Sequence, residues 1–154
     1  MRCRNERPSL PTPASLQRLV RRALLERAKA DAGLIALVPV GSIAPTGERT
    51  WPFVMVESPR TLRLRMACVR GAQVSFDVHA FAGPRVVANA TVETGYDHVS
   101  RIGSAIETVF ADNNLTLEGG AKCKIEFSDT QFFKDGSPDD WHWVAQLNCR
   151  VLAE

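Results

Sequence analysis

Residues 71–81, Gly-Ala-Gln-Val-Ser-Phe-Asp-Val-His-Ala-Phe, contain the clearest secondary-structure pattern in the chain. Apolar residues at positions 74, 76, 78 and 80 alternate with polar residues at positions 73, 75, 77 and 79. A two-residue period is typical of a β-strand with one buried face and one exposed face. We therefore expect this strand to lie inside a sheet whose apolar face is covered by helices.

The first helix is predicted on the N-terminal side of this strand. Thr12 and Pro13 can supply an N-cap and a first-turn proline, and apolar residues then recur at helical spacing to about Ala32. Gly33 is placed to end the helix in a left-handed conformation. Basic residues occupy the opposite face of this helix: Arg18, Arg21, Arg22 and Lys29.

The second helix is predicted after residue 94. Thr94 and Asp97 have the spacing of a capping box, and residues 112–114 are expected to stop the helix. Gly103 lies on the apolar stripe, where it costs about 1 kcal/mol relative to Ala in helix propensity. We expect a close approach of the helix backbone to the sheet to offset this cost.

Three further strands complete the predicted sheet. Residues 53–57 form a short β-rich run that Pro59 is expected to close, and prolines at both of its ends favour an edge strand. The last third is interpreted as a long hairpin with a turn at residues 135–138. Its first strand changes phase near Ser128 and Asp129, which predicts a β-bulge.

These elements predict one α/β (α+β) domain. It consists of a mostly antiparallel sheet of about four strands with two main helices packed on one face. A chain of 154 residues fits a single domain, which we place at residues 14–154. Residues 1–13 contain three prolines and no periodicity, and are expected to form a flexible basic arm.

The composition and the order of residues disfavour a membrane-spanning protein, a secreted protein and a zinc protein. The longest apolar run, residues 33–38, is far shorter than the roughly 20 residues that a membrane span needs. The Arg-rich start leads into prolines instead of an apolar segment, so no secretion signal is expected. Four cysteines without Cys-x-x-Cys spacing make a zinc site improbable, and Cys123 and Cys149 are expected in the core.

Charge is unevenly distributed, although the net charge is only +2. Residues 1–30 contain eight Arg or Lys and two Glu, whereas residues 86–154 contain eleven acidic and five basic residues. The basic end of one copy could therefore meet the acidic side of a neighbouring copy. A solvated tail and helix face is the alternative interpretation.

The segment of residues 60–70 alternates Arg with apolar residues. It is interpreted either as an arm or hairpin tip that faces a polyanion or an acidic protein surface, or as a surface hairpin whose Arg stems cover apolar groups. Nucleic-acid binding by the first helix is disfavoured, because no helix-turn-helix pattern, aromatic interleaving or zinc spacing accompanies its basic face.

An enzyme would have to be built from a few histidines and aspartates. Asp77 and His79 share a strand face, and His142 would join them only if the last strand pairs beside theirs. That cluster could hold a metal, but a solvated sheet face produces the same residues. No nucleophile elbow, P-loop, dinucleotide-binding turn or zinc-protease motif is present, so we expect neither catalysis nor a cofactor.

The order of several segments resembles the tail-completion proteins of long-tailed bacteriophages and gene transfer agents, also called tail terminators or tail-to-head joining proteins. The resemblance covers residues 14–152 and rests on the order and spacing of its segments. The matching segments are Leu-Val-Arg-Arg-Ala-Leu-Leu-Glu-Arg, Ala-Asp-Ala-Gly-Leu-Ile-Ala-Leu-Val, Trp-Pro-Phe-Val-Met-Val-Glu, Arg-Gly-Ala-Gln-Val-Ser-Phe-Asp-Val-His-Ala-Phe, and the hairpin from Leu-Thr-Leu-Glu-Gly-Gly to Trp-His-Trp.

The resemblance implies a virion protein that forms a homohexameric ring on the last ring of the tail tube. Such a ring stops tube polymerisation and joins the tail to the head connector or stopper protein, with DNA in the lumen as a further contact. Assembly would occur in the host cytoplasm. The N-terminal arm and residues 82–95 are longer than the family pattern. Our candidate interface residues are Arg18, Arg21, Arg22, Arg60, Arg63, Arg65, Arg70, Asp139 and Asp140.

Two alternatives share most of these features. A neck or head-tail connector adaptor of the same particle would have the same fold and charge distribution. A small nucleic-acid-binding module would use the basic residues of the first helix and of residues 60–70.

Overall fold

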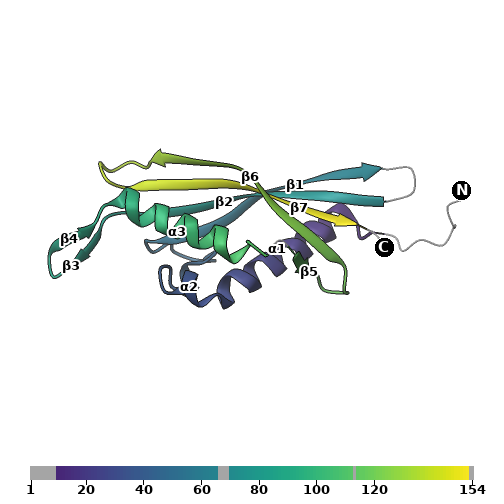
Figure 1. Cartoon of the computed structure of the whole chain (residues 1–154), viewed down its shortest axis with the longest axis horizontal. Helices are drawn as coiled ribbons and strands as arrows, with labels where there is room; N and C mark the ends of the chain where they lie inside the picture. Colours follow the sequence, from purple (N-terminus) through teal and green to yellow (C-terminus); the bar gives the residue numbers. More distant parts are fainter. Residues whose placement is uncertain (1–9, 66–69, 113, 153–154) are drawn as a thin grey trace, which may run out of the picture.

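A five-stranded antiparallel sheet carries the other elements of the protein (Figure 1). The computed structural model describes residues 10–65, 70–112 and 114–152. The strand order is β1-β2-β7-β6-β5, and a separate two-stranded sheet contains β3 and β4. The elements are α1 (Pro13–Ala30), α2 (Ala32–Ile35), η1 (Val40–Ser42), β1 (Phe53–Arg65), β2 (Arg70–Ala82), β3 (Arg85–Val87), β4 (Ala90–Glu93), α3 (Gly95–Val109), β5 (Asn114–Thr116), β6 (Lys122–Lys134) and β7 (Trp141–Leu152).

Strand β2 has the alternation that the sequence predicts. Val74, Phe76, Val78 and Ala80 are buried, and they face the helices across the core. Strand β2 lies between β1 and β7, and its pairing with β7 runs without a register shift from Gly71 opposite Leu152 to Ala82 opposite Trp141. The mixed α+β class and the antiparallel sheet are therefore confirmed. The sheet has five strands rather than about four, because β5 adds a short edge strand.

Helices α1 and α3 cover the same face of the sheet (Figure 1). Their apolar stripes meet the buried faces of β2 and β7, as the helical spacing predicts. The core side chains of the two helices are Leu16, Val20, Ala23, Leu24 and Ala28 from α1, and Val99, Ile102, Ile106 and Val109 from α3.

The predicted end of the first helix is wrong. Helix α1 stops at Ala30, and Asp31 adopts an extended conformation. The Asp31 side chain accepts a hydrogen bond from the Leu34 N–H and so caps α2. Gly33 lies inside α2 and has no left-handed conformation. An acidic N-cap ends one helix and starts the next, which removes the need for a glycine cap.

The predicted Thr94 cap and the close approach of α3 are confirmed, and the Asp97 carboxylate accepts a hydrogen bond from the Thr94 hydroxyl at 2.9 Å. The Thr94 hydroxyl accepts a hydrogen bond from the Asp97 N–H at 3.1 Å. Gly103 faces the buried Trp143, and a Cβ atom at Gly103 would lie 2.8 Å from Cε2 of that indole. The glycine therefore lets the helix backbone pack directly on an aromatic ring of β7.

The predicted end of the first strand is also wrong. Strand β1 continues through Pro59 to Arg65, so residues 53–57 are only its first part. Its register shifts between Glu57 and Arg60, and Ser58 has a φ of 53°. Pro59 therefore lies in a β-bulge, where its missing N–H does not interrupt the ladder to β2. The predicted edge position of this strand is confirmed.

The C-terminal hairpin agrees with the sequence prediction. The register of β6 and β7 shifts between Phe127 and Asp129, where the change of phase predicts a bulge. Residues 136–139 form bends and turns between the strands, one residue beyond the predicted turn at residues 135–138. Cys123 and Cys149 are buried and free, as expected, whereas Cys3 and Cys68 lie outside the described residues.

The remaining segments complete the architecture. Residues 85–93, part of the predicted insertion, form the β3–β4 hairpin at one end of the molecule (Figure 1). Residues 1–9 of the predicted arm lie outside the described part of the chain, and Thr12 and Pro13 cap and begin α1. No helix in the described residues is long and apolar enough to span a membrane.

We predict that Gly103→Ala destabilises the protein by about 1–3 kcal/mol, because the new methyl group overlaps the Trp143 ring. This loss outweighs the gain of about 1 kcal/mol that alanine provides in a helix. Urea denaturation measures the change in the free energy of unfolding. The neighbouring exposed variant Ser104→Ala is the control and should stay within about 0.5 kcal/mol of the parent. Equal or higher stability of Gly103→Ala would contradict the prediction.

Candidate assembly interface

The basic and acidic candidate residues are separated along the molecule. The β1–β2 hairpin extends to one end of the long axis, and the β6–β7 turn lies at the other end (Figure 1). Arg65 and Arg70 are register partners at the end of the β1–β2 ladder, and their side chains lie outside the described part of the structure. Asp139 and Asp140 are in the opposite turn. The fold thus holds the two groups far apart, and neither group can neutralise the other within one subunit.

Two of the arginines in β1 differ in their partners. Arg60 contacts Asp77 of β2, with Nη2 3.0 Å from Oδ1. Arg63 is exposed, and no ion pair joins it to any described residue. A surface pair such as Arg60–Asp77 contributes at most about 1 kcal/mol. The predicted interpretation as a surface hairpin therefore fits Arg60, whereas Arg63 remains available to another molecule.

The arginines of α1 mostly contact their own subunit. The Arg21 Nε donates to the Val56 carbonyl oxygen at 3.3 Å. Arg22 forms ion pairs with Glu26 at 3.2 Å and with Glu118 at 3.0 Å. Arg18 is exposed and lines a shallow surface depression of about 290 Å³ along this helix. Part of the predicted basic face thus stabilises the contact of α1 with its neighbours.

Asp139 has a defined role inside the subunit. Its Oδ2 accepts a hydrogen bond of 3.0 Å from the Gly95 N–H at the start of α3. A carboxylate at this position satisfies an unpaired N–H and interacts favourably with the helix dipole. A Cβ at Gly95 would overlap the Asp139 carbonyl oxygen, so only glycine fits there. The β6–β7 turn is therefore held against the start of α3.

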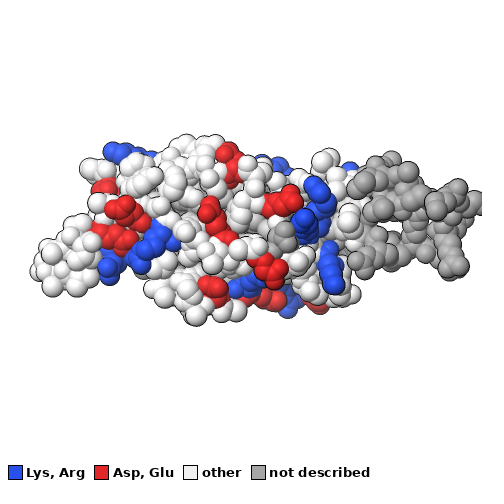
Figure 2. Space-filling view, viewed as in Figure 1, with Lys and Arg blue, Asp and Glu red and all other residues white. Residues whose placement is uncertain are grey.

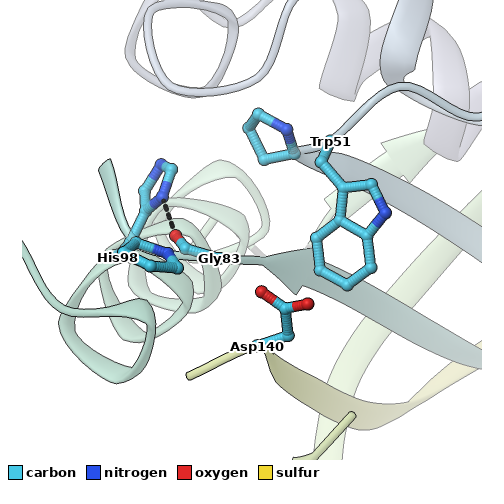
Figure 3. Close-up of a pocket in the computed structure, with 6 residues that line it drawn as sticks. Trp51, Gly83, His98 and Asp140 are labelled. Carbon is cyan, nitrogen blue, oxygen red and sulfur yellow. Dashed lines mark hydrogen bonds between the residues drawn. The ribbon is translucent and has the colours of Figure 1, made fainter. Parts of the chain in front are cut away.

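Asp140 lines a shallow cavity of about 270 Å³ at the same end of the molecule. Figure 3 shows its carboxylate projecting between Gly83 and the Trp51 ring. His98 borders this cavity and is fixed by a hydrogen bond of 2.9 Å between its Nδ1 and the Gly83 carbonyl oxygen. The other described residues that line the cavity are Pro52 and Pro84, so Asp140 and His98 are its two titratable groups among the described residues.

Strand pairing brings two histidines together on the sheet face opposite the helices. Because β2 pairs with β7, His79 Nδ1 lies 2.8 Å from His142 Nε2, and one ring nitrogen donates to the other. The last strand therefore pairs beside the strand of His79, as is required for His142 to join it. Asp77 instead pairs with Arg60. No group of three or more metal-ligating side chains occurs among the described residues.

An aromatic cluster surrounds this histidine pair. His142 stacks on Phe81 with ring centroids 4.1 Å apart, and Phe81 stacks on Phe53 at 4.6 Å. Trp51 and Phe133 lie at its margins and are both exposed. Sequence reasoning missed this cluster because its members come from four separate segments, and only the strand register brings them together.

The environment of His142 disfavours its charged form. Burial lowers the pKa of the imidazole below its usual value of 6.5, His79 lowers this pKa further, and Asp135 acts in the opposite direction. The neutral form also supplies a nitrogen that can accept the hydrogen bond within the pair. The pair is therefore stable when at least one ring is neutral.

Charges are intermixed on the surface over the helices. Figure 2 shows Lys and Arg side chains lying among Asp and Glu side chains, without one extended patch of a single sign on this face. One mixed group combines Glu93 with Arg85 and Arg101. A backbone-binding surface for DNA would need a continuous positive stripe. This face of the subunit therefore does not favour DNA binding.

We predict that acidification destabilises the parent protein more than a His142→Phe variant. A pKa that folding lowers gives stabilisation that is complete above pH 6.5 and is lost as the pH falls below that value. The free energy of unfolding, measured in urea between pH 7.5 and 5.0 at a concentration where the protein is monomeric, should fall more steeply for the parent. His98 is retained in both proteins and serves as an internal control. Parallel pH profiles would contradict the prediction.

Comparisons with known proteins agree with this architecture. The chain is similar in fold to a chain from the structure titled "Virion of native gene transfer agent (GTA) particle", with a TM-score of 0.72 and 16% sequence identity. The similarity covers 94% of this chain and 100% of that chain. No curated protein sequence matches at a significant level.

A protein-family model supplies the assignment at the level of sequence. The model for tail completion protein gp17 matches residues 22–152, which include every strand of both sheets and the second half of α1. The match extends over far more than half of the chain. The protein therefore belongs to the tail completion protein gp17 family and is a structural protein of a phage-type virion tail.

Proposed function

We propose that the protein is a tail terminator, which forms a ring on the end of the tail tube, stops tube polymerisation and joins the tail to the head. The observation that carries this proposal is the match to the tail completion family over residues 22–152. The fold similarity to a chain of a gene transfer agent virion supports it. The separation of the Arg residues of the β1–β2 hairpin from Asp139 and Asp140 supports contact between copies, because these two groups can attract each other only between different subunits.

The partners follow from this role. The protein would contact further copies of itself in a homohexamer, the tail tube protein below the ring, and a connector or stopper protein above it. Arg18, Arg63 and Asp140 are the best candidates for these contacts, because the first two are exposed and Asp140 borders an open cavity. Arg22 and Asp139 are weaker candidates, since each already has a partner within the subunit.

A neck adaptor of the same particle is the second candidate function. It would share the fold and the family resemblance, so only its binding partner distinguishes it. A terminator binds the end of a tube of tail protein, whereas an adaptor binds the portal side of a head. Catalysis has no comparable support, because the family is one of structural virion proteins.

We predict that the purified protein forms rings in solution or on tubes. Six copies of 17.0 kDa would give a particle of about 102 kDa in size-exclusion chromatography with light scattering. Negative-stain images should show closed rings with a central opening. A strict monomer at high concentration, both alone and with tail tubes present, would count against the proposal.

We also predict that the protein limits the length of tubes assembled from the tail tube protein. Adding it during polymerisation should shorten the tubes in electron micrographs in proportion to its concentration, because each capped end stops growing. Adding an equal amount of an unrelated basic protein of similar size is the control. Unchanged tube lengths together with binding to tail-free heads would favour the neck adaptor.

A further inference from the structure

Both edges of the five-stranded sheet have backbone that no described strand pairs with. Strand β1 forms one edge. At the other edge, β5 pairs only with Lys122, Cys123 and Lys124, so residues 125–134 of β6 have no described strand on their outer side. An unpaired edge presents N–H and C=O groups that can bind another strand. The subunit thus offers two different edges, one on each side.

Only the outer half of β1, residues 60–65, is available to pair with another strand. The inner half is covered, because the Ala44 N–H donates to the Val54 carbonyl oxygen at 2.7 Å and Arg21 donates to the Val56 carbonyl oxygen. The bulge at Ser58 separates this half from residues 60–65. In that outer half Leu62 is 62% exposed. Any strand that joins this edge must therefore pair with residues 60–65.

Between the bulge with Asp129 at one end and Lys134 at the other, the free edge of β6 is little protected against pairing. Residues 128–134 are all exposed. Residues 130–133, Thr-Gln-Phe-Phe, contain no charge, glycine or proline after the bulge, although natural edge strands are commonly blunted by such residues. Phe133 is 47% exposed. A strand of this composition is suited to pairing with a partner rather than to facing solvent.

Charge identifies the partner as the other edge of a second copy. Residues 60–65 contain three Arg and no acidic residue. Residues 128–134 contain Asp129 and Lys134, and the turn that follows them adds Asp135, Asp139 and Asp140. Pairing β1 with β1 of another copy would place Arg beside Arg, which costs free energy. Pairing β1 with β6 would avoid this repulsion and bring the Arg side chains close to Asp129 and to the acidic β6–β7 turn.

The topology sets the direction of that pairing. Strand β1 is antiparallel to β2, β2 to β7, and β7 to β6, so β1 and β6 run in opposite directions within one subunit. A second copy that continues the sheet in the same orientation would therefore place its β1 antiparallel to β6. Because the two edges are different surfaces, the contact is head-to-tail and can close into a ring.

The two edges lie at different levels along the strands. Arg60 pairs with Ser75, Ser75 pairs with Asn148, and Asn148 pairs with Glu126, so Arg60 and Glu126 lie at the same height along the strands. The exposed part of β6 begins two residues after Glu126 and extends in the direction opposite to residues 60–65. Neighbouring subunits must therefore be offset along the strand direction. In closed sheets such an offset is accompanied by a tilt of the strands from the ring axis.

We propose that residues 60–65 of one copy pair antiparallel with residues 128–134 of β6 in the next copy, so that the sheets of neighbouring subunits join into one. This contact rests on the proposed ring and specifies how its subunits bind each other. The mode is β-strand addition, in which backbone hydrogen bonds provide affinity and the flanking charges select the partner edge.

Hydrogen exchange measured by mass spectrometry tests the pairing directly. The full-length protein is compared as rings and as monomers obtained by dilution. Amides in residues 60–65 and 128–134 should exchange about tenfold or more slowly in the ring, because pairing adds backbone hydrogen bonds. Residues 53–57 are the internal control and should change little, since that half of the edge is already covered.

Charge-reversed variants test the choice of partner edge. Arg63→Glu and Asp129→Arg should each raise the dissociation constant of the ring about tenfold or more, and the double variant should recover much of the loss. Glu107→Arg on the exposed side of α3 changes the net charge as much as Asp129→Arg and should have little effect. Equal weakening by Glu107→Arg would overturn the role of charge at this edge.

Three outcomes overturn the pairing itself. If the amides of residues 60–65 and 128–134 exchange as fast in the ring as in the monomer, the pairing is excluded, while the terminator function stays intact. An edge of β6 that is already slow in the monomer would show that another part of the same chain covers it. Protection that requires tail tubes would assign the edge to the tube protein. Conversely, edge pairing without any effect on tube length would retain this inference and reject the terminator function.

Discussion

The uninterrupted pairing of β2 with β7 is the interaction on which the rest of the structure depends. It joins two strands that are about 70 residues apart in the chain, from Gly71 opposite Leu152 to Ala82 opposite Trp141. Both strands place their apolar residues on one face, so a slip of one residue would expose both sets at once. The outer strands contain bulges, whereas this central ladder contains none. The register of the whole sheet is therefore set at its centre.

The central ladder also determines how the helices pack. Trp143 lies opposite Ala80 and projects toward α3, where Gly103 leaves room for its ring. At the N-terminus of the same helix, the Asp139 side chain caps the first turn, and Gly95 allows the backbone of Asp139 to approach the helix. Gly103 carries a cost in helix propensity, and its direct contact with the large buried ring of Trp143 offsets this cost. These contacts connect the sheet, the helix and the C-terminal hairpin.

The consequences for function appear at the periphery rather than in a cavity. Among the described residues, the unpaired backbone lies at the edges of the sheet, on β1 and β6, and Asp140 lies in the β6–β7 turn at one end of the molecule. An assembly protein needs such surfaces, because its partners are other proteins that bind along extended faces. The histidine pair on the open face adds a group whose neutral form the fold prefers. Family membership and surface properties thus point in the same direction.

The sequence by itself determined the two main helices, the long strands of the sheet, the buried face of β2, both helix stripes, the Thr94 cap, the bulge in β6 and the family resemblance. These features depend on local periodicity and on short-range backbone chemistry, which one segment contains in full. Only the tertiary structure decided that β1 continues through Pro59, that Asp31 links two helices, and that Asp139 caps α3. It also decided which strands are neighbours, and hence the pairing of His79 with His142 and the two free edges. Strand order arises from contacts between distant segments, so no local pattern encodes it.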